Sequence, residues 1–283
     1  MTKLRFRSFG NRLFRYASVA RAAWLLILLS ANFSSAAAQA PQSMLPFARG
    51  EELVYQAEFT RGLLRGIDVA EFHFQARSEH VSKGAEDPVI LRLTGDVVSK
   101  GLFPKIAGFK FHQHVESIAQ PVPFAVLHTD KIDEQGKRSR VLEALFNHET
   151  HKATWTERNP NPGSVIIDFS EPIQDVLTVI YFLRTQKLEV GKSFDVPLSD
   201  AGRLYRFSVK AVERKQLNTV LGRVNAIRVE PALFGDAGVV RARGLLSIWV
   251  TDDERRLPVR AQLKVDIGTF DIKLKRLSYP QPK

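Results

Sequence analysis

The sequence predicts a mainly β fold, a large curved antiparallel sheet or open β-barrel (half-barrel-like) wrapped around one buried α-helix. Two observations support this prediction. Apolar and polar residues alternate with a period of two along most of the chain after residue 40, as they do in strands that bury one face. One segment, Ile173–Arg184, instead carries its apolar residues at helical spacing.

The clearest strand is Leu257–Ile267, where every odd position is apolar and every even position except Pro258 is polar. Gly268 and Thr269 then turn the chain into a second alternating segment, 270–275. Short turns of this kind join antiparallel neighbours, because parallel strands need long crossovers. The same alternation and similar turn signals upstream predict about a dozen strands in all.

The expected helix over Ile173–Arg184 has start signals in the sequence. Ser170 is expected to cap its first turn, Pro172 is tolerated there, and Asp175 suits the positive end of the helix dipole. Val179 and Phe182 place apolar side chains on its outer side as well. We therefore expect a helix that is buried on most sides.

Residues 1–40 have the layout of a secretory signal peptide. A basic stretch ends at Arg21, the apolar run Ala22–Leu29 follows, and Ala38-Gln39-Ala40 precedes Pro41. The apolar run is too short to cross a bilayer, which takes about 20 residues. These features predict cleavage near Pro41 and export to the periplasm of a Gram-negative-type bacterium, with no transmembrane span in the mature chain.

The composition is that of an ordinary globular protein, with 283 residues, 44% of them hydrophobic and 25% charged. We expect one antiparallel β domain over 41–283, with pseudo-halves 41–158 and 164–283 on either side of the Pro-rich Asn159–Gly163. The absence of cysteine excludes thiol catalysis, disulfides and a lipid-anchoring cysteine.

The net charge of +11 is not evidence for nucleic-acid binding. Six of the 41 basic residues lie in 1–40, which holds no acid, so 35 basic and 30 acidic residues remain. The remaining basic residues form no stripe interleaved with aromatics. We expect no nucleic-acid partner.

Several motifs resemble the domain of unknown function 3108 (DUF3108) family. They are the opening Arg49–Tyr55 and the segments 172–184, 188–194, 221–231 and 246–260. The resemblance covers about Pro46 to Leu277. It implies an exported, mainly β protein, and it brings no established activity or catalytic residues.

Many of the 19 phenylalanines fall at inward-facing strand positions. A filled core explains them most simply, and an apolar ligand pocket between sheet and helix is the alternative. The candidate pocket residues are Phe72, Phe74, Phe109, Phe111, Leu177, Tyr181, Phe207 and Trp249. The apolar loop 98–108 could form the mouth of such a pocket through Leu102, Phe103 and Ile106.

His112 and His114 lie two apart on one strand face, a spacing that can place two imidazoles on one metal ion. His148 and His151 could add ligands. A solvated polar face explains the same spacing and is favoured, because neighbouring Lys110 would repel a cation. We predict no cofactor and no catalytic residues, since the motifs of hydrolases, nucleotide-binding proteins and metalloproteases are missing from the sequence.

The sequence therefore favours a non-catalytic periplasmic protein that binds a lipid-like or other apolar or amphipathic envelope molecule. A scaffold or interaction protein of envelope assembly with a filled core, bound to an envelope protein partner, is the main alternative. An uncharacterised hydrolase is a third. The sequence does not predict an oligomeric state.

Overall fold

The computed structural model describes residues 45–47, 50–80, 89–101, 104, 108, 110–235, 238–240 and 242–279. All of them lie in the unit that begins at Met44. The signal peptide expected over 1–40 lies outside these residues.

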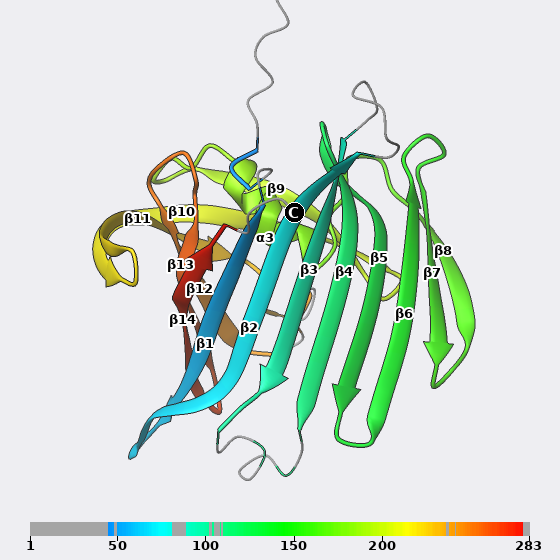
Figure 1. The fold of residues 1–283 in the computed structure, drawn as a ribbon. Helices are drawn as coiled ribbons and strands as arrows, with labels where there is room; N and C mark the ends of the chain where they lie inside the picture. The colour runs from blue at the N-terminus through cyan, green and yellow to red at the C-terminus, as the bar shows by residue number, and fades with distance from the viewer. Residues whose placement is uncertain are drawn as a thin grey trace, which may run out of the picture. The chain divides into compact units, whose positions relative to one another are not determined.

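The described strands form one antiparallel sheet of 14 strands (Figure 1). Their spatial order runs from β8 back to β1, and then through β14 down to β9. The mainly β prediction is confirmed. The strands are β1 (Glu51–Arg61), β2 (Leu64–His80), β3 (Val89–Ser99), β4 (Phe111–Pro121), β5 (Phe124–Gln135), β6 (Arg138–Asn147), β7 (Lys152–Asn159), β8 (Gly163–Asp168), β9 (Ser193–Asp200), β10 (Arg203–Thr219), β11 (Gly222–Pro231), β12 (Gly244–Thr251), β13 (Pro258–Val265) and β14 (Gly268–Ser278).

The helix α3 spans Thr178–Thr185 and is shorter than the expected Ile173–Arg184. The expected start was wrong because Gln174 forms a parallel bridge to Leu198 of β9. The residue that organises the first turn is Asp175 and not Ser170. The Asp175 carboxylate accepts hydrogen bonds from the backbone N–H groups of Leu177 and Thr178, at 2.9 and 2.6 Å.

The Asp175 carboxylate also ties this turn to the sheet. Its second oxygen accepts hydrogen bonds from the hydroxyls of Ser117 on β4 and Thr129 on β5. All three side chains are fully buried. A buried carboxylate is stable only when such donors satisfy it, so these bonds fix where the helix begins.

The glycine Gly95 on β3 lets α3 approach the sheet closely. A Cβ atom there would lie 3.1 Å from the Leu177 Cδ1 atom and 3.1 Å from the Phe74 ring. The other end of the helix is fixed by an ion pair between Arg184 and Glu51 of β1, in which both side chains are almost completely buried.

The curvature of the sheet brings its two edges together at one corner. The Trp155 indole on β7 donates a hydrogen bond of 2.8 Å to the Ser199 hydroxyl on β9. Nearby, the Lys131 ammonium lies 2.9 Å from the Asp200 carboxylate. Because β8 and β9 are not paired, the sheet stays open.

Two turns differ in detail from the sequence prediction. The turn between β13 and β14 is Asp266–Ile267, one pair earlier than the expected Gly268–Thr269, since Val265 pairs with Gly268. Ile267 is therefore exposed rather than buried. The segment 160–162 within the Pro-rich Asn159–Gly163 stretch joins β7 to β8, which pair as a hairpin.

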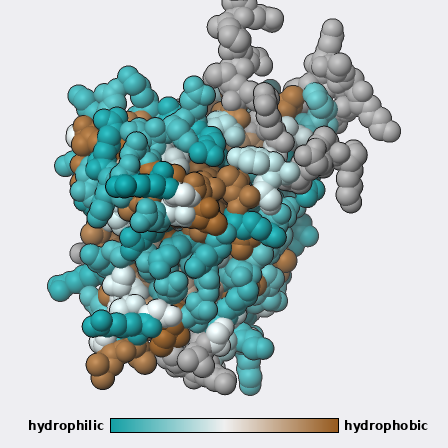
Figure 2. Space-filling model, turned by 60° about the vertical axis from the view of Figure 1, so that its left-hand side comes forward, coloured by the Kyte–Doolittle hydropathy of each residue, from teal (hydrophilic) through white to brown (hydrophobic). Residues whose placement is uncertain are grey.

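Hydrophilic residues cover most of the face seen in Figure 2. Apolar residues gather in the upper middle of this face and at its lower end. Among the described residues, no helix has the length and apolar character needed to cross a membrane.

Candidate functional site

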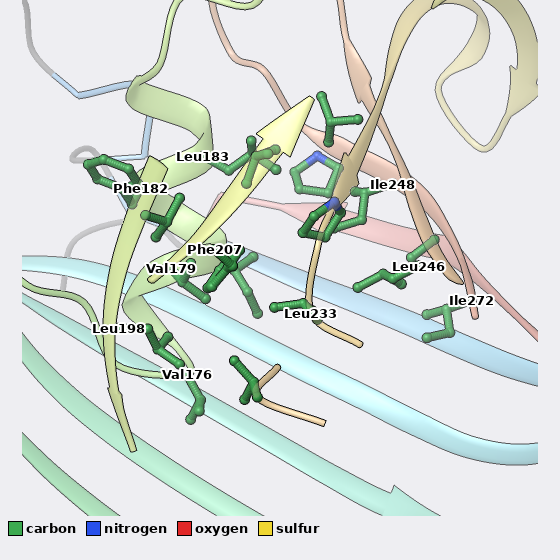
Figure 3. Close-up of a pocket in the computed structure, with 18 of the residues that line it drawn as sticks. Val176, Val179, Phe182, Leu183, Leu198, Phe207, Leu233, Leu246, Ile248 and Ile272 are labelled. Atoms are coloured by element: carbon green, nitrogen blue, oxygen red, sulfur yellow. The ribbon is translucent and has the colours of Figure 1, made fainter. Parts of the chain in front are cut away.

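An apolar cavity of about 360 Å³ lies between α3 and the curved sheet. Its walls come from α3 and the residues just before it, from the inner faces of β1 and β2, and from β9 to β14. Figure 3 shows side chains of α3, β9, β10 and β12 around this space. The volume falls in the range of small-molecule sites, about 300 to 1,000 Å³.

One side of the helix lines the cavity, and another side packs against the sheet. Val176, Val179 and Leu183 line the cavity. Leu177 and Tyr181 pack instead against the inner faces of β3 and β4. This division follows from helical spacing, since residues four apart lie on the same side of a helix.

Two polar side-chain groups occur among the described residues that line the cavity, and both have partners. The Tyr55 hydroxyl donates a 2.7 Å hydrogen bond to the Pro258 carbonyl. The Arg260 side chain points to the opposite face of β13 from its neighbour Ala261, and its guanidinium forms a bidentate ion pair there with Asp271, at 2.6 and 3.0 Å. The cavity therefore offers dispersion contacts and burial to an occupant, with little unpaired charge.

Burial raises the pKa of the Tyr55 phenol well above its usual value, and the neighbouring Arg184 lowers it by a smaller amount. The phenol therefore stays neutral at physiological pH. The described residues that line the cavity include no histidine, carboxylate, serine, threonine or lysine.

The cavity borders a place where two neighbouring strands separate. β11 and β12 pair only between Ala226–Val229 and Ile248–Thr251. Beyond that point the chain leaves β11 and returns at Gly244, and Leu233 and Val239 of this connection line the cavity. One side of the cavity is therefore formed by the connection between β11 and β12, and not by paired strands.

A family model described as protein of unknown function (DUF3108) matches residues 54–275. The chain belongs to the DUF3108 family. The resemblance read from the sequence motifs is confirmed. A search of curated proteins found no match.

Two solved structures are similar to this DUF3108 protein. A β-barrel-like protein of the domain of unknown function DUF1849 from Brucella abortus has a TM-score of 0.52 and 9% identity, over 82% of this chain and 98% of that one. A putative lipoprotein from Parabacteroides distasonis has a TM-score of 0.30 and 9% identity, over 83% of this chain and 99% of that one. The first similarity supports the β-barrel-like fold alone.

The predicted pocket residues of this DUF3108 protein fall in different places. Phe72, Phe74 and Phe207 line the cavity. Phe111 belongs to a separate cluster around Ala57 and Ala70. Phe109 and the three expected mouth residues, Leu102, Phe103 and Ile106, lie outside the described residues.

Trp249 also lies away from the cavity. Its strand neighbour Ile248 lines the cavity, and successive side chains of a strand face opposite ways. The Trp249 ring instead carries the Arg260 guanidinium 5.0 Å from its centroid, a cation–π contact.

Sequence reasoning missed most of the aliphatic wall. Val196, Leu198, Val229 and Ile248 all follow the period-two pattern of their strands. That pattern marks them as inward-facing, but it does not show which inward-facing residues meet one another and which meet a void.

The four histidines considered as metal ligands lie in two separate places, with His112 and His114 beside Asp96 and with His148 and His151 against the Phe169 ring. The His112 Nε2 and His114 Nδ1 atoms both contact the Asp96 carboxylate, at 3.4 and 2.8 Å. The His148 ring bonds the Val126 carbonyl at the opposite end of β5.

The closest grouping of potential ligands among the described residues is His128, Asp130 and Glu143, on the outer face of β5 and β6. The Arg158 guanidinium already pairs with Glu143. This pairing, more than the nearby His128, holds the pKa of the Glu143 carboxyl below its usual value. The arginine supplies the positive charge that a cation would otherwise bring.

Proposed function

We propose that this protein is a non-catalytic carrier that binds an apolar chain, such as the acyl chain of an envelope lipid, in the cavity between α3 and the sheet. The observation that carries the proposal is the character of the lining, which is aliphatic and aromatic apart from a hydrogen-bonded tyrosine and a paired arginine.

The size of the cavity supports a chain of moderate length. A volume of about 360 Å³ lies near the lower end of the range of small-molecule sites, about 300 to 1,000 Å³. A volume of this size suits a medium acyl chain or part of a longer one. A polar ligand would leave its donors and acceptors unpaired there, at a cost of about 1 to 3 kcal/mol for each group.

We also propose that the carrier acts in the periplasm after cleavage near Pro41. The basic stretch, the apolar run Ala22–Leu29 and the Ala38-Gln39-Ala40 site support this localisation. N-terminal sequencing of protein recovered from the cell envelope tests it. A mature chain that still begins with Met1 would contradict it.

The carrier proposal is tested with a substitution that fills the cavity. Ala261 is a small lining residue on β13, so Ala261→Phe places a ring in the space that the chain would occupy. Gln262→Phe is the matched control, because the next residue of the strand faces the other side. Both variants are first checked for native stability by urea unfolding.

Binding is measured with a fluorescent dansyl-undecanoate probe and by mass spectrometry of lipids extracted from the purified protein. We expect the native protein and Gln262→Phe to bind the probe and carry an extracted acyl compound. Ala261→Phe should bind the probe at least tenfold more weakly. Equal binding by both variants, or no probe binding by the native protein, would refute the proposal.

A further inference from the structure

Two hairpin turns and one strand start form an exposed apolar tip at one end of the sheet. Leu63 is 100% exposed, Ile267 is 56% exposed, and Leu64 and Leu245 are 48% and 42% exposed. We call these four residues the apolar tip. Exposed apolar residues that occur singly need no explanation, but neighbouring ones mark an interaction surface.

Strand pairing places the members of the apolar tip side by side. Thr60 and Thr269 pair at the ends of β1 and β14, which brings the β1–β2 turn beside the β13–β14 turn. Leu245 of β12 pairs with Lys264, just before the β13–β14 turn. Both turns lie at the lower end of the sheet in Figure 1, and apolar residues gather at the lower end of the face in Figure 2.

Basic side chains surround the apolar tip. Arg61, Arg65, Arg243 and Lys264 are all exposed, and Asp68 and Asp266 are the exposed acids at the same strand ends. The excess of positive charge favours an anionic surface. Each lysine or arginine close to an anionic bilayer contributes about 1 kcal/mol to binding.

We propose that the apolar tip docks on the surface of a bilayer that contains anionic lipids, with Leu63 and Leu64 inserted among the lipids and Arg61 and Arg65 at the headgroups. An apolar hairpin flanked by arginines has the layout of an interfacial anchor, with a hydrophobic end and cationic residues just behind it.

The apolar residues on the inner face of the sheet favour a bilayer over a protein as the surface that the apolar tip binds. Phe59 and Phe270, next to the two turns, pack with ring centroids 4.9 Å apart. They share one hydrophobic cluster with Phe72 and Ile272, which line the cavity. An apolar path therefore connects the tip to the cavity, and a bilayer contains chains of the kind that would fit there.

Gly268 allows the two turns to pack so closely. Its φ of +145° is rarely adopted by residues with a side chain, and a Cβ atom at this position would lie 2.5 Å from the Phe59 ring. The side-by-side arrangement of the turns is thus built into the fold. Docking at the tip requires no particular occupant of the cavity, so it goes beyond the carrier proposal and can be tested separately.

The test is co-sedimentation with vesicles of phosphatidylcholine mixed with phosphatidylglycerol, and with vesicles of phosphatidylcholine alone. The protein is expressed as the full chain, and mass spectrometry identifies its N-terminus, so that every variant is compared in the same processed form. We expect the native protein to bind the anionic vesicles more tightly than the neutral ones, with a difference that shrinks as salt is added.

Leu63→Ser with Leu64→Ser should weaken binding to the anionic vesicles at least tenfold, because leucine burial is lost. Arg61→Gln with Arg65→Gln should weaken it by about fivefold for each arginine. The matched control is Val220→Ser with Arg223→Gln in the β10–β11 hairpin, where an apolar residue and an arginine are also exposed. This control should bind like the native protein.

Leu63→Trp gives a second readout. Its fluorescence should shift to the blue with anionic vesicles and stay unchanged with neutral ones, after subtraction of the native signal. Equal vesicle binding by the native protein and the double leucine variant would overturn the proposal. Recovery of a protein partner that the leucine variant loses, without any vesicle binding, would overturn it as well. Loss of dansyl-undecanoate binding in Ala261→Phe leaves these results unaffected.

Discussion

The buried ion pair between Glu51 and Arg184 should be among the most sensitive points of the fold. Both side chains are about 1% exposed. The guanidinium donates to both Glu51 oxygens and, through Nε at 3.1 Å, to the Arg255 carbonyl. It also lies 5.0 Å from the centroid of the Phe47 ring. The pair thus joins the end of α3 to β1 and to the turn before β13.

Glu51→Gln keeps the shape of the side chain and removes its charge, so Arg184 stays buried without a counter-ion. Breaking a buried pair in this way costs about 3 to 5 kcal/mol, against a total stability of about 5 to 15 kcal/mol for a domain. For a domain of this size the loss corresponds to a fall in Tm of about 6 to 20 °C. Urea unfolding followed by circular dichroism measures the free energy of unfolding.

Glu52→Gln is the matched control. Glu52 is the next residue of β1 and pairs at 3.3 Å with Arg276, whose side chain is 59% exposed. An exposed pair contributes about 0 to 1 kcal/mol, so this variant should unfold almost like the native protein. The double variant Glu51→Leu with Arg184→Met should lose less stability than the sum of the two single changes. If Glu51→Gln lost no more than Glu52→Gln, the proposed role of the buried pair would be wrong.

Three further predictions concern the same core. Tyr181→Phe should leave the free energy of unfolding unchanged or raise it slightly in urea unfolding, because the buried hydroxyl has no hydrogen-bond partner among the described residues; a loss above about 1 kcal/mol would contradict this. Gly95→Val should cost about 1 to 3 kcal/mol in thermal unfolding, since its side chain would collide with Leu177, whereas Thr94→Val on the outer face should cost little. Burial raises the pKa values of Tyr55 and Tyr181 above the usual 10.0, so both phenols stay neutral in the folded protein while they ionise in the unfolded chain above that pH. The contribution of these neutral phenols to the free energy of unfolding should be fully present below pH 10 and should fall above it by up to about 1.4 kcal/mol per pH unit for each tyrosine. Urea unfolding at a series of alkaline pH values measures this fall. If the native protein lost stability no more steeply than the double variant Tyr55→Phe/Tyr181→Phe, the prediction would be wrong.

The strands were predictable because the alternation of apolar and polar residues within each strand shows which of its side chains are buried. In β13, Arg260, Gln262 and Lys264 alternate with apolar residues. Because successive side chains of a strand point to opposite faces, the polar residues lie on one face and the apolar residues on the other. The turn after β13 was misplaced because alternation continues through Asp266 and Ile267, although these two residues form the turn. A local pattern does not show where hydrogen bonding between strands stops.

The start of the helix depended on contacts far away in the sequence. Apolar spacing runs on smoothly from Ile173 to Arg184, so periodicity places no boundary inside this segment. The boundary is set by Ser117 and Thr129, which bind the Asp175 carboxylate from two strands more than 40 residues away. Such partners become visible only after the sheet has formed.

The candidate site was predictable in kind but not in detail. Phe72, Phe74 and Phe207 face inward and line the cavity, whereas Leu177 and Tyr181 also face inward and fill a different cluster. Sequence alternation separates inside from outside. It does not specify how one part of the inner face packs on another, which depends on the curvature of the sheet.

The helix α3 is short compared with the width of the sheet that curls around it. Fourteen strands spaced about 4.8 Å apart make a sheet roughly 60 Å wide, while a helix of eight residues is only about 12 Å long. A helix this short covers only part of the inner face, and the sheet curls until the Trp155 indole on β7 donates a hydrogen bond to the Ser199 hydroxyl on β9. Between α3 and the curled sheet, the side chains that line the cavity leave a space of about 360 Å³. Val229 lines this space, so Val229→Ala should enlarge the cavity and leave the fold unchanged.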